Sequence, residues 1–349
     1  MSVVEASRPR TRAPRVAVCR PQVPFVRGGA EIFTDRLVEE LRQRDVDAEI
    51  VSLPLQTWPN HQLAKAMMMW RLVDLVTDMD PPADLVIATK FPSYLVRHPN
   101  KVVWLVHQFR QAYELHGTPF GQFGDSPEDR SVRQGVIDLD VVSLGEARKL
   151  FATSANVAER LRRSTGLDAE VLPHPPQELP YRSDRYGDFV LSVGRLDATK
   201  RVHLLLHAAA LEPDLKVVVV GEGAERKRLE EMACDRVRFA GRVSGDELAD
   251  LYARCRAVFY APLDEDFGMV TYEAFRAARP VVTTSDAGGP LEVVVDGRNG
   301  RVVAPEPPAI ARALRDLLAD DELAARLGTA GRADAAPVTW QRAIDRLLG

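Results

Sequence analysis

The sequence predicts an α/β protein made of two Rossmann-like, doubly wound domains. Short apolar runs alternate with longer segments of helical period, and some runs, such as 101–106, are apolar throughout, which is typical of a parallel sheet covered on both faces. The chain of 349 residues is long for a single hydrophobic core. A stretch rich in proline and polar residues, 173–187, interrupts the alternation, which then restarts. We therefore expect an N-terminal domain over 15–178, a second domain over 188–330 and a terminal helix within 331–349.

Composition and charge narrow the possible partners. Lys and Arg number 46 against 50 Asp and Glu, a net charge of -4, so no basic field attracts nucleic acid. The three cysteines, Cys19, Cys234 and Cys255, contain no Cys-x-x-Cys pair, which indicates a reducing compartment and no structural metal. The first fifteen residues lack the apolar core of a secretory signal, and no apolar run approaches the ~18 residues that span a bilayer. We expect a cytoplasmic protein, with peripheral attachment at the inner face of the membrane left open.

The elements of the N-terminal domain follow the alternation in order. Strands are expected at 16–19, 48–53, 84–89, 101–106, 150–153 and 169–172, and helices at 32–44, 61–76, 131–149 and 155–164. Ahead of the first helix, Gly28 and Gly29 form a turn that either faces a ligand or allows strand and helix to pack closely. The second helix carries three methionines and a tryptophan at 67–70. We interpret it as a core-packed helix, with contact to a membrane or a lipid acceptor as the alternative.

Two features follow the strand 101–106. His107 closes this strand at the edge where open α/β sheets carry ligands, so it is either a ligand contact or a hydrogen-bonded structural residue. The next segment, 111–130, is rich in Gly, Pro, Phe and Asp and shows no periodicity. A long segment of this kind is usually functional or mobile. We interpret it as a functional loop, with a plain disordered insert as the alternative.

The first turn of the second domain carries two cations. The strand 189–195 ends at Arg195, and Lys200 stands at the start of the next helix. At a strand end, both can converge on one diphosphate, the arginine through paired hydrogen bonds and the lysine as a point charge, whereas isolated surface cations would be solvated. The next strand ends at Gly221 in a Gly-x-Gly turn, which is weak evidence for a nucleotide by itself. The remaining elements are expected at 216–220, 251–257, 301–303, 308–319 and 321–327.

The stretch 258–284 reads as one β-α-β unit with acidic side chains at its strand edge. Glu265 lies in the loop after the first strand, and Glu273 follows eight residues later in a helix expected over 267–279. Free backbone N–H groups, which suit a phosphate, are presented by the residues that start this helix, Phe267, Gly268 and Met269. Carboxylates accept hydrogen bonds from sugar hydroxyls. The combination describes a nucleotide-sugar pocket, although two carboxylates at this spacing alone are common on solvated helix faces.

These residues resemble the glutamate-x7-glutamate motif of the retaining glycosyltransferases of family 4. That motif is usually written as Glu-Gly-Phe-Gly with a Glu-Ala pair later in the helix, and here Glu265-Asp266-Phe267-Gly268 and Glu273-Ala274 stand in register. Pro-Val-Val and Gly-Gly-Pro-Leu-Glu follow, also in register. Asp266 replaces the usual glycine. Arg195 and Lys200 have the spacing of the family's pyrophosphate-binding pair, and the usual Lys-Gly has become Lys200-Arg201, which adds charge. The segment 237–244 is similar to the family's strand and following loop beside the nucleobase.

The resemblance implies the GT-B fold, in which two Rossmann-like domains face each other across a cleft and a C-terminal helix crosses back to the first domain. The second domain would hold the donor, with Glu265 at the sugar hydroxyls and Glu273 at the ribose. The diphosphate would contact Gly29, Arg195, Lys200, Phe267, Gly268 and Met269, and the nucleoside would lie beside Val243 and Gly221. His107 would face the transferred sugar. The loop 111–130 would lie on the acceptor side.

The function that we expect from this resemblance is transfer of a hexose from a UDP- or GDP-linked sugar to an acceptor hydroxyl, with retention of anomeric configuration. The acceptor would be a glycan, a lipid-linked molecule or a small natural product. No cofactor and no metal are expected, since Asp-x-Asp pairs such as those starting at Asp78, Asp138 and Asp264 arise by chance in a chain with 28% charged residues. Two alternatives stay open: a GT-B nucleotide-sugar 2-epimerase, and a non-catalytic sugar-nucleotide-binding subunit.

Overall fold

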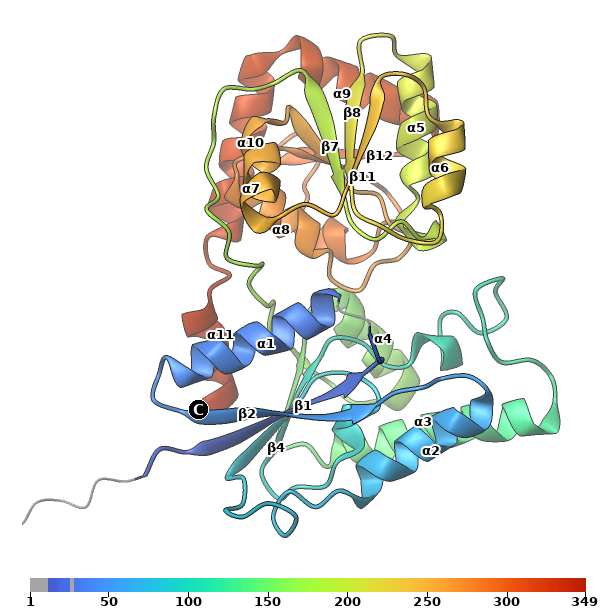
Figure 1. Ribbon diagram of the computed structural model, residues 1–349, viewed down its shortest axis with the longest axis vertical. Helices are drawn as coiled ribbons and strands as arrows, with labels where there is room; N and C mark the ends of the chain where they lie inside the picture. The colour runs from blue at the N-terminus through green and yellow to red at the C-terminus, as the bar shows by residue number, and fades with distance from the viewer. Residues whose placement is uncertain (1–11, 26–27) are drawn as a thin grey trace, which may run out of the picture. The chain divides into compact units, whose positions relative to one another are not determined.

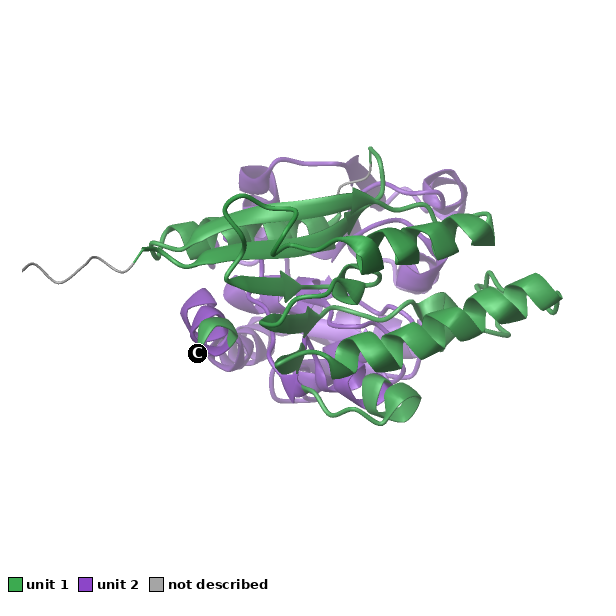
Figure 2. Cartoon of the chain, turned by 90° about the horizontal axis from the view of Figure 1, so that it is seen from below, with its two compact units in different colours: residues 1–151, 161–169, 347–349 green, residues 152–160, 170–346 purple. Residues whose placement is uncertain are grey.

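The computed structural model describes residues 12–25 and 28–349, which divide into two compact units. Unit 1 consists of residues 12–25, 28–151, 161–169 and 347–349, and unit 2 of residues 152–160 and 170–346 (Figure 2). Residues 152–160 and 170–178, which we expected in the N-terminal domain, group with unit 2, and the last three residues group with unit 1. Most of the N-terminal segment that we searched for a secretory signal lies outside the described residues.

The first sheet has six strands in the order β2-β1-β3-β4-β5-β6. The strands are β1 Arg15–Gln22, β2 Asp47–Pro54, β3 Leu85–Ala88, β4 Lys101–Leu105, β5 Lys149–Ala152 and β6 Glu170–Val171. The helices and 3-10 turns of this part are α1 Gly29–Arg42, α2 Asn60–Leu72, η1 Ser93–Leu95, η2 Arg110–Ala112, α3 Pro127–Gly145 and α4 Ala155–Thr165. β1 pairs in parallel with both β2 and β3, and Figure 1 shows α1 on one face of the sheet and α2 and α3 on the other. Every residue of β3 and β4 is buried, as their uninterrupted apolar runs predict.

Two helices of unit 1 differ from the prediction at their ends. α2 ends at Leu72 instead of 76, because the Asp74 side chain accepts a hydrogen bond from the Val76 backbone N–H (2.9 Å) and forms a turn. α3 begins at Pro127 instead of 131, because the Ser126 side chain caps the N–H of Asp129 and proline suits the first helical turn. The interpretation of α2 as a core-packed helix is confirmed for two of the four residues at 67–70, Met67 and Trp70, which are buried.

The second sheet, in unit 2, has the order β12-β11-β10-β7-β8-β9, and its pairings are parallel. The strands are β7 Phe189–Val193, β8 Lys216–Val220, β9 Val237–Gly241, β10 Ala257–Phe259, β11 Val281–Thr284 and β12 Gly300–Val303. The helices are α5 Val202–Leu211, α6 Arg226–Met232, α7 Gly245–Arg254, α8 Met269–Arg276, α9 Pro307–Ala319, α10 Asp321–Ala335 and α11 Trp340–Leu348. Two 3-10 turns, η3 Ala198–Lys200 and η4 Gly289–Glu292, lie at the ends of strands β7 and β11. Among the described residues, no helix combines the length and the hydrophobicity that crossing a bilayer requires.

Alternation along the strands of unit 2 produces two apolar cores, one on each face of the sheet. Val190 of β7 and Phe259 of β10 belong to a cluster with residues of α5 and α9. Their neighbours Leu191 and Val258 belong to the other cluster, with residues of α7 and α8. Successive side chains of a strand point to opposite faces, so each strand supplies both cores. This packing fixes the C-terminal strand ends, where the predicted site residues of this unit lie.

Candidate functional site

The loop that carries Glu265 is held by backbone hydrogen bonds to the neighbouring turn after β11. The N–H of Asp264 donates to the carbonyl of Asp286 (3.0 Å), and the N–H of Glu265 donates to the carbonyl of Ala287 (2.8 Å). In return, the N–H of Gly289 donates to the carbonyl of Glu265 (2.8 Å). β10 and β11 are adjacent parallel strands, so both turns lie at the C-terminal edge of the sheet.

The close approach of these two turns requires glycine at position 288. Gly288 has a φ of +75°, which favours glycine, and a Cβ atom there would lie 2.6 Å from the carbonyl oxygen of Glu265. The Gly-Gly-Pro-Leu-Glu segment seen in the sequence therefore has a physical role: it lets one turn pack directly against the loop that carries Glu265.

The structure brings Glu265 and Lys200 together. The Lys200 Nζ contacts the Glu265 carboxylate, which also accepts a hydrogen bond from the Tyr260 hydroxyl (3.0 Å). Lys200 is placed by η3, whose first N–H groups are capped by Asp197, and about a sixth of each charged side chain is exposed (16% and 17%). A cation beside a hydrogen-bond acceptor can contact a phosphate and a sugar hydroxyl at adjacent points. The sequence analysis missed Tyr260, which precedes the motif as the last residue before the loop.

The other two cations of this turn behave differently. Arg195 is 74% exposed, and its guanidinium lies 3.5 Å from the Asp197 carboxylate. The charge that Arg201 adds to the sequence is paired within the protein, because its guanidinium donates to both carboxylate oxygens of Asp286 (2.7 Å each). It also donates to the Thr284 hydroxyl and to two backbone carbonyls after β10. Arg201 has a φ of +51°, so the position keeps the left-handed backbone that glycine adopts easily while its side chain braces the loop.

Helix α8 begins at Met269, two residues later than the sequence predicted. Gly268 is its N-cap, and no side chain caps the first backbone N–H groups. Phe267 is buried, and its ring stacks on Tyr272 (4.7 Å between centroids) and lies against His174 (4.3 Å). The helix start therefore has a rigid aromatic support and keeps backbone donors free of side-chain caps, which suits an anion.

Glu273 lies on the second turn of this helix and is buried. It is 6% exposed, and one carboxylate oxygen accepts a hydrogen bond from the Tyr252 hydroxyl (2.7 Å). Burial raises the pKa of Glu273, and the Tyr252 hydrogen bond opposes that increase. Tyr252 thus orients the carboxylate that we expected at the ribose, and the sequence analysis did not identify it.

The two residues expected beside the nucleoside lie at the ends of neighbouring strands. Gly221 follows β8, and a Cβ atom there would lie 1.9 Å from the carbonyl oxygen of Gly194, which follows β7. Close packing of two turns therefore accounts for this glycine. Val243 follows β9 and packs partly buried against the core cluster that includes Tyr252 and Phe267.

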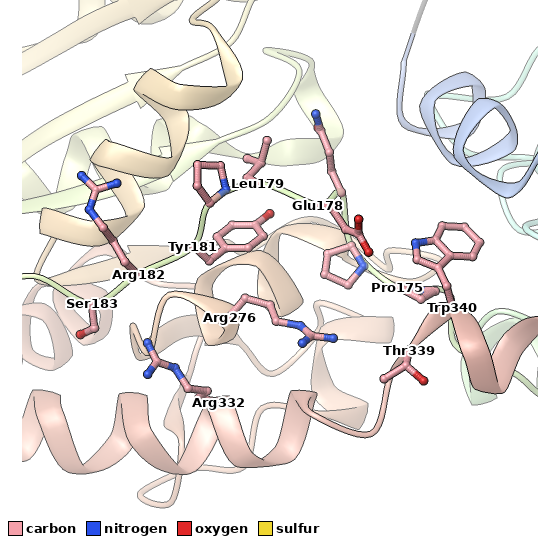
Figure 3. A pocket seen from close by; sticks show the side chains of 13 residues that line it. Pro175, Glu178, Leu179, Tyr181, Arg182, Ser183, Arg276, Arg332, Thr339 and Trp340 are labelled. Carbon is pink, nitrogen blue, oxygen red and sulfur yellow. The ribbon is translucent and has the colours of Figure 1, made fainter. Parts of the chain in front are cut away.

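A pocket of about 740 Å³ in unit 2 contains none of the predicted site residues. It is lined by residues 175–183 and by side chains of α8, α10 and α11, with Tyr181, Arg276 and Arg332 among them (Figure 3). The Tyr181 ring packs edge-on against Tyr252 (6.1 Å between centroids), the tyrosine that bonds Glu273. Tyr181, which lines the pocket, is therefore linked through Tyr252 to Glu273, the carboxylate expected at the ribose.

In unit 1, His107 lies after the C-terminal end of β4, as predicted. Its Nδ1 is 2.6 Å from the backbone oxygen of Gln108. The buried Gln108 side chain donates to Asp140 (3.0 Å) and accepts from the Ser164 hydroxyl (3.0 Å). The backbone that carries His107 is thus fixed by a polar network, which the sequence pattern does not show.

The turn at the start of α1 and the loop 111–130 are also described. Among the described residues, nothing lies within 4 Å of a Cβ atom added at Gly29, so close packing does not account for this glycine. The loop is fastened to the start of α2 by Gln122, whose side chain donates to the Thr57 carbonyl (3.0 Å) and to the Asn60 side chain (2.9 Å). The acceptor-side role of the loop stays a prediction.

Asp140 leads to a prediction about pH. Its fully buried carboxylate accepts hydrogen bonds from Tyr94, Tyr113 and Gln108, yet desolvation outweighs them and raises its pKa from 3.8 to about 6. The folded state therefore holds this proton more tightly than the unfolded state does. The stabilisation that results is complete below the unfolded pKa of 3.8 and is lost as the pH rises to about 6. The loss amounts to at most roughly 1.4 kcal/mol per pH unit. The melting temperature of the wild type minus that of Asp140→Asn should be larger near pH 4 than near pH 7. An equal difference at both values would show that Asp140 does not titrate in this window.

Comparison with known proteins adds to this geometry. Residues 181–334 match the family model described as Glycosyl transferases group 1. D-inositol 3-phosphate glycosyltransferase of Streptomyces bingchenggensis is 29% identical over 274 residues, which cover 68% of this chain and 59% of that protein. The GDP-mannose-dependent alpha-(1-6)-phosphatidylinositol monomannoside mannosyltransferase of Mycolicibacterium smegmatis is 32% identical over 219 residues, 56% of this chain and 57% of that protein. The chain thus spans less than two thirds of either relative.

Solved structures match over nearly the whole chain. Sucrose-phosphate synthase from Thermosynechococcus elongatus has a TM-score of 0.76 at 20% identity, covering 96% of this chain and 97% of that one. HepE of Anabaena, in complex with UDP and glucose, has a TM-score of 0.69 at 19% identity, covering 95% and 98%. WaaG, a glycosyltransferase involved in lipopolysaccharide biosynthesis, has a TM-score of 0.70 at 18% identity, covering 96% and 100%.

The fold is therefore that of the GT-B glycosyltransferases, with two parallel-sheet Rossmann-like domains of six strands each, as predicted. The chain carries a Glycosyl transferases group 1 domain of the family 4 type over residues 181–334, which confirms the resemblance read from its motifs.

Proposed function

We propose that this chain is a retaining hexosyltransferase that uses a UDP- or GDP-linked sugar and needs no metal ion. The observation that carries the proposal is the cluster of Lys200, Glu265 and Tyr260 at the C-terminal strand edge of unit 2, next to the uncapped start of α8. An ammonium and free backbone N–H groups suit a diphosphate, and a carboxylate suits sugar hydroxyls. The relatives support the same donor class: the mannosyltransferase of Mycolicibacterium smegmatis is GDP-mannose-dependent, and the HepE structure holds UDP and glucose.

The proposed reaction breaks the bond between the anomeric carbon and the diphosphate and forms a bond to the acceptor oxygen on the same face of the sugar. The acceptor proton passes to the leaving diphosphate, as the family resemblance implies. Arg195, Lys200 and the start of α8, with Phe267, Gly268 and Met269, would stabilise the charge on the leaving group. Glu265 would hold the sugar and Glu273 the ribose, with the nucleoside near Val243 and Gly221.

Unit 1 would supply the acceptor side, with Gly29 near the diphosphate and His107 at the transferred sugar. A cavity of about 550 Å³ lies beyond the C-terminal ends of β1 and β2, lined by residues such as Leu55, Trp58 and Met69. Open α/β sheets bind ligands at this edge, so the cavity supports a glycan, lipid-linked or small-molecule acceptor here. A cytoplasmic location, with peripheral contact at the inner membrane face, belongs to the same proposal; the exposed Met68 and Leu72 of α2 support such contact.

A donor screen tests the proposed reaction. The protein is incubated with UDP- and GDP-linked hexoses, with EDTA present, and both free sugar and interconverted nucleotide sugar are measured. Release of hexose from one of these donors supports the transferase. Accumulation of an epimeric nucleotide sugar would show that the protein is the 2-epimerase instead. Binding of the donor without any conversion, even when an acceptor extract is added, would show that it is a non-catalytic subunit.

His107→Ala should lower turnover by roughly tenfold or more while leaving the affinity for UDP or GDP nearly unchanged. The reason is that His107 would contact the transferred sugar in the transition state, whereas the nucleotide is held by unit 2. Turnover per folded molecule and calorimetric affinity are measured on one preparation, with the exposed His207 of α5, changed to alanine, as the control. A folded variant with full activity would remove His107 from the site.

A further inference from the structure

The first half of helix α4 is bonded to the loop that carries Glu265, and both lie within unit 2. Each carbonyl of the loop residues 264–266 accepts a hydrogen bond from one side chain of this helix or its cap. Arg160 donates to the carbonyl of Asp264 (2.8 Å), Asn156 to that of Glu265 (2.9 Å), and Ser154 to that of Asp266 (2.5 Å). All three backbone carbonyls of the loop are therefore bonded to α4 or to its cap, whereas the N–H groups of Asp264 and Glu265 are bonded to the turn after β11.

Arg160 also neutralises the two acidic side chains that flank Glu265. Its guanidinium pairs with the carboxylate of Asp264 (2.6 Å) and with that of Asp266, and its side chain is only 5% exposed. A buried arginine with two carboxylates and a carbonyl is a strongly directional contact, since the guanidinium is planar and its donors are fixed. Asp266 is the residue that replaces the usual glycine of the motif, and Arg160 gives that replacement a partner.

The start of helix α4 is held by hydrogen bonds to its own N-cap and to η4. Ser154 caps α4 through the N–H of Val157 (3.0 Å), and the carboxylate of Glu292 accepts from the N–H groups of Ala155 (2.8 Å) and Asn156 (2.7 Å). Glu292 ends η4, whose first residue, Gly289, donates to the carbonyl of Glu265. The loop is therefore held between α4 and η4, which are joined to each other.

The loop needs such support because part of it is strained. Asp264 has a φ of +47°, a left-handed conformation that a residue with a side chain adopts at a cost. Strained residues persist only where the surrounding contacts determine their conformation, and they concentrate at functional sites. Arg160 holds Asp264 in this conformation through its contacts to the carbonyl and the carboxylate of that residue.

We propose that Arg160 is a positioning residue: it holds the loop 264–266 so that the Glu265 carboxylate stays against Lys200 and Tyr260, where it can receive the donor sugar. This inference rests on the proposed function in one respect only, the contact between Glu265 and the donor. The contacts between Arg160 and the loop 264–266 do not depend on the proposed function.

Kinetics test the positioning role. Arg160→Gln should lower kcat by roughly tenfold or more, while the affinity for UDP or GDP changes less than about twofold, because the sugar contact is displaced and the nucleotide contacts remain. Arg160→Lys should recover part of the loss, since a lysine can pair with one of the carboxylates. Adding Asp266→Gly to Arg160→Gln should also recover part of it, because one of the two carboxylates that lose their arginine partner is then removed. Arg163→Gln, an exposed arginine of the same helix, is the matched control.

Hydrogen exchange separates the inference from the proposed function. In Arg160→Gln, the N–H groups of Asp264 and Glu265 should exchange roughly tenfold faster or more, with the sheet amides unchanged. Unchanged exchange in the loop would overturn the inference whatever the enzyme does, and so would faster exchange with an unaltered kcat. If the wild type turns over no nucleotide sugar, the proposed function fails, and the exchange of these two amides alone then decides whether Arg160 holds the loop.

Discussion

Glu265→Gln is expected to lower turnover of the donor sugar by roughly 10- to 150-fold, the loss that corresponds to a charge-assisted hydrogen bond worth about 1.5–3 kcal/mol. The carboxylate accepts from Tyr260 and contacts Lys200 in the protein, and a glutamine amide has a single acceptor oxygen with which to replace both this arrangement and the sugar contact. The shape of the side chain is preserved, so the variant should fold normally. Steady-state kinetics with the best donor from the screen measure the effect.

Glu230→Gln is the matched control, because Glu230 is a carboxylate on the surface helix α6 that pairs with Arg226. It should retain wild-type turnover. If Glu265→Gln and Glu230→Gln were equally active, Glu265 would have no role in holding the sugar, and the interpretation of the motif would be lost.

Lys200→Gln is expected to weaken binding of UDP or GDP by roughly 10- to 150-fold, again the equivalent of one charged hydrogen bond. Lys200 is held by η3 with its ammonium aimed at Glu265, at the end of β7 where a diphosphate would lie. Arg195→Ala should weaken binding by several-fold, since its guanidinium is 74% exposed and solvent screens its charge. Calorimetric titration measures both affinities.

The control for these cations is Lys216→Gln. Lys216 is an exposed lysine of the same unit that pairs with Asp188 (2.5 Å), at the N-terminal end of β8, the opposite edge of the sheet. It should bind the nucleotide as the wild type does. A loss of the same size in Lys216→Gln would indicate a nonspecific effect of charge and would remove Lys200 from the diphosphate site.

The order of the strands could be predicted from the sequence because both sheets are parallel and buried, so that apolar runs mark the strands directly. One helix, α6, was not predicted. The ends of helices were less accessible. α2 stops at Leu72 through a side-chain turn made by Asp74, and α8 starts after Gly268, whose left-handed φ of +85° ends the loop. Both boundaries depend on hydrogen bonds and dihedral angles that hydrophobic periodicity does not carry.

The candidate site could be predicted only where a short motif contains it. Glu265 and Lys200 were found from their strand-end positions, and the structure shows that they meet. Arg160 was missed because it lies 104 residues before Asp264 in the chain. The aspartate that replaces glycine at 266 did indicate a nearby cation, because a carboxylate in a partly buried loop needs a partner for its charge. The sequence does not show which of 46 lysines and arginines supplies it.

The central claim, that unit 2 binds a nucleotide diphosphate sugar without metal, is tested most directly by calorimetric titration of the wild type with UDP, GDP and their hexose derivatives in the presence of EDTA. We expect saturable binding of one of the two nucleotides, with an affinity that Lys200→Gln reduces and Lys216→Gln does not. Absence of binding by both nucleotides and by both sugar derivatives would contradict it, as would binding that appears only when a divalent cation is restored.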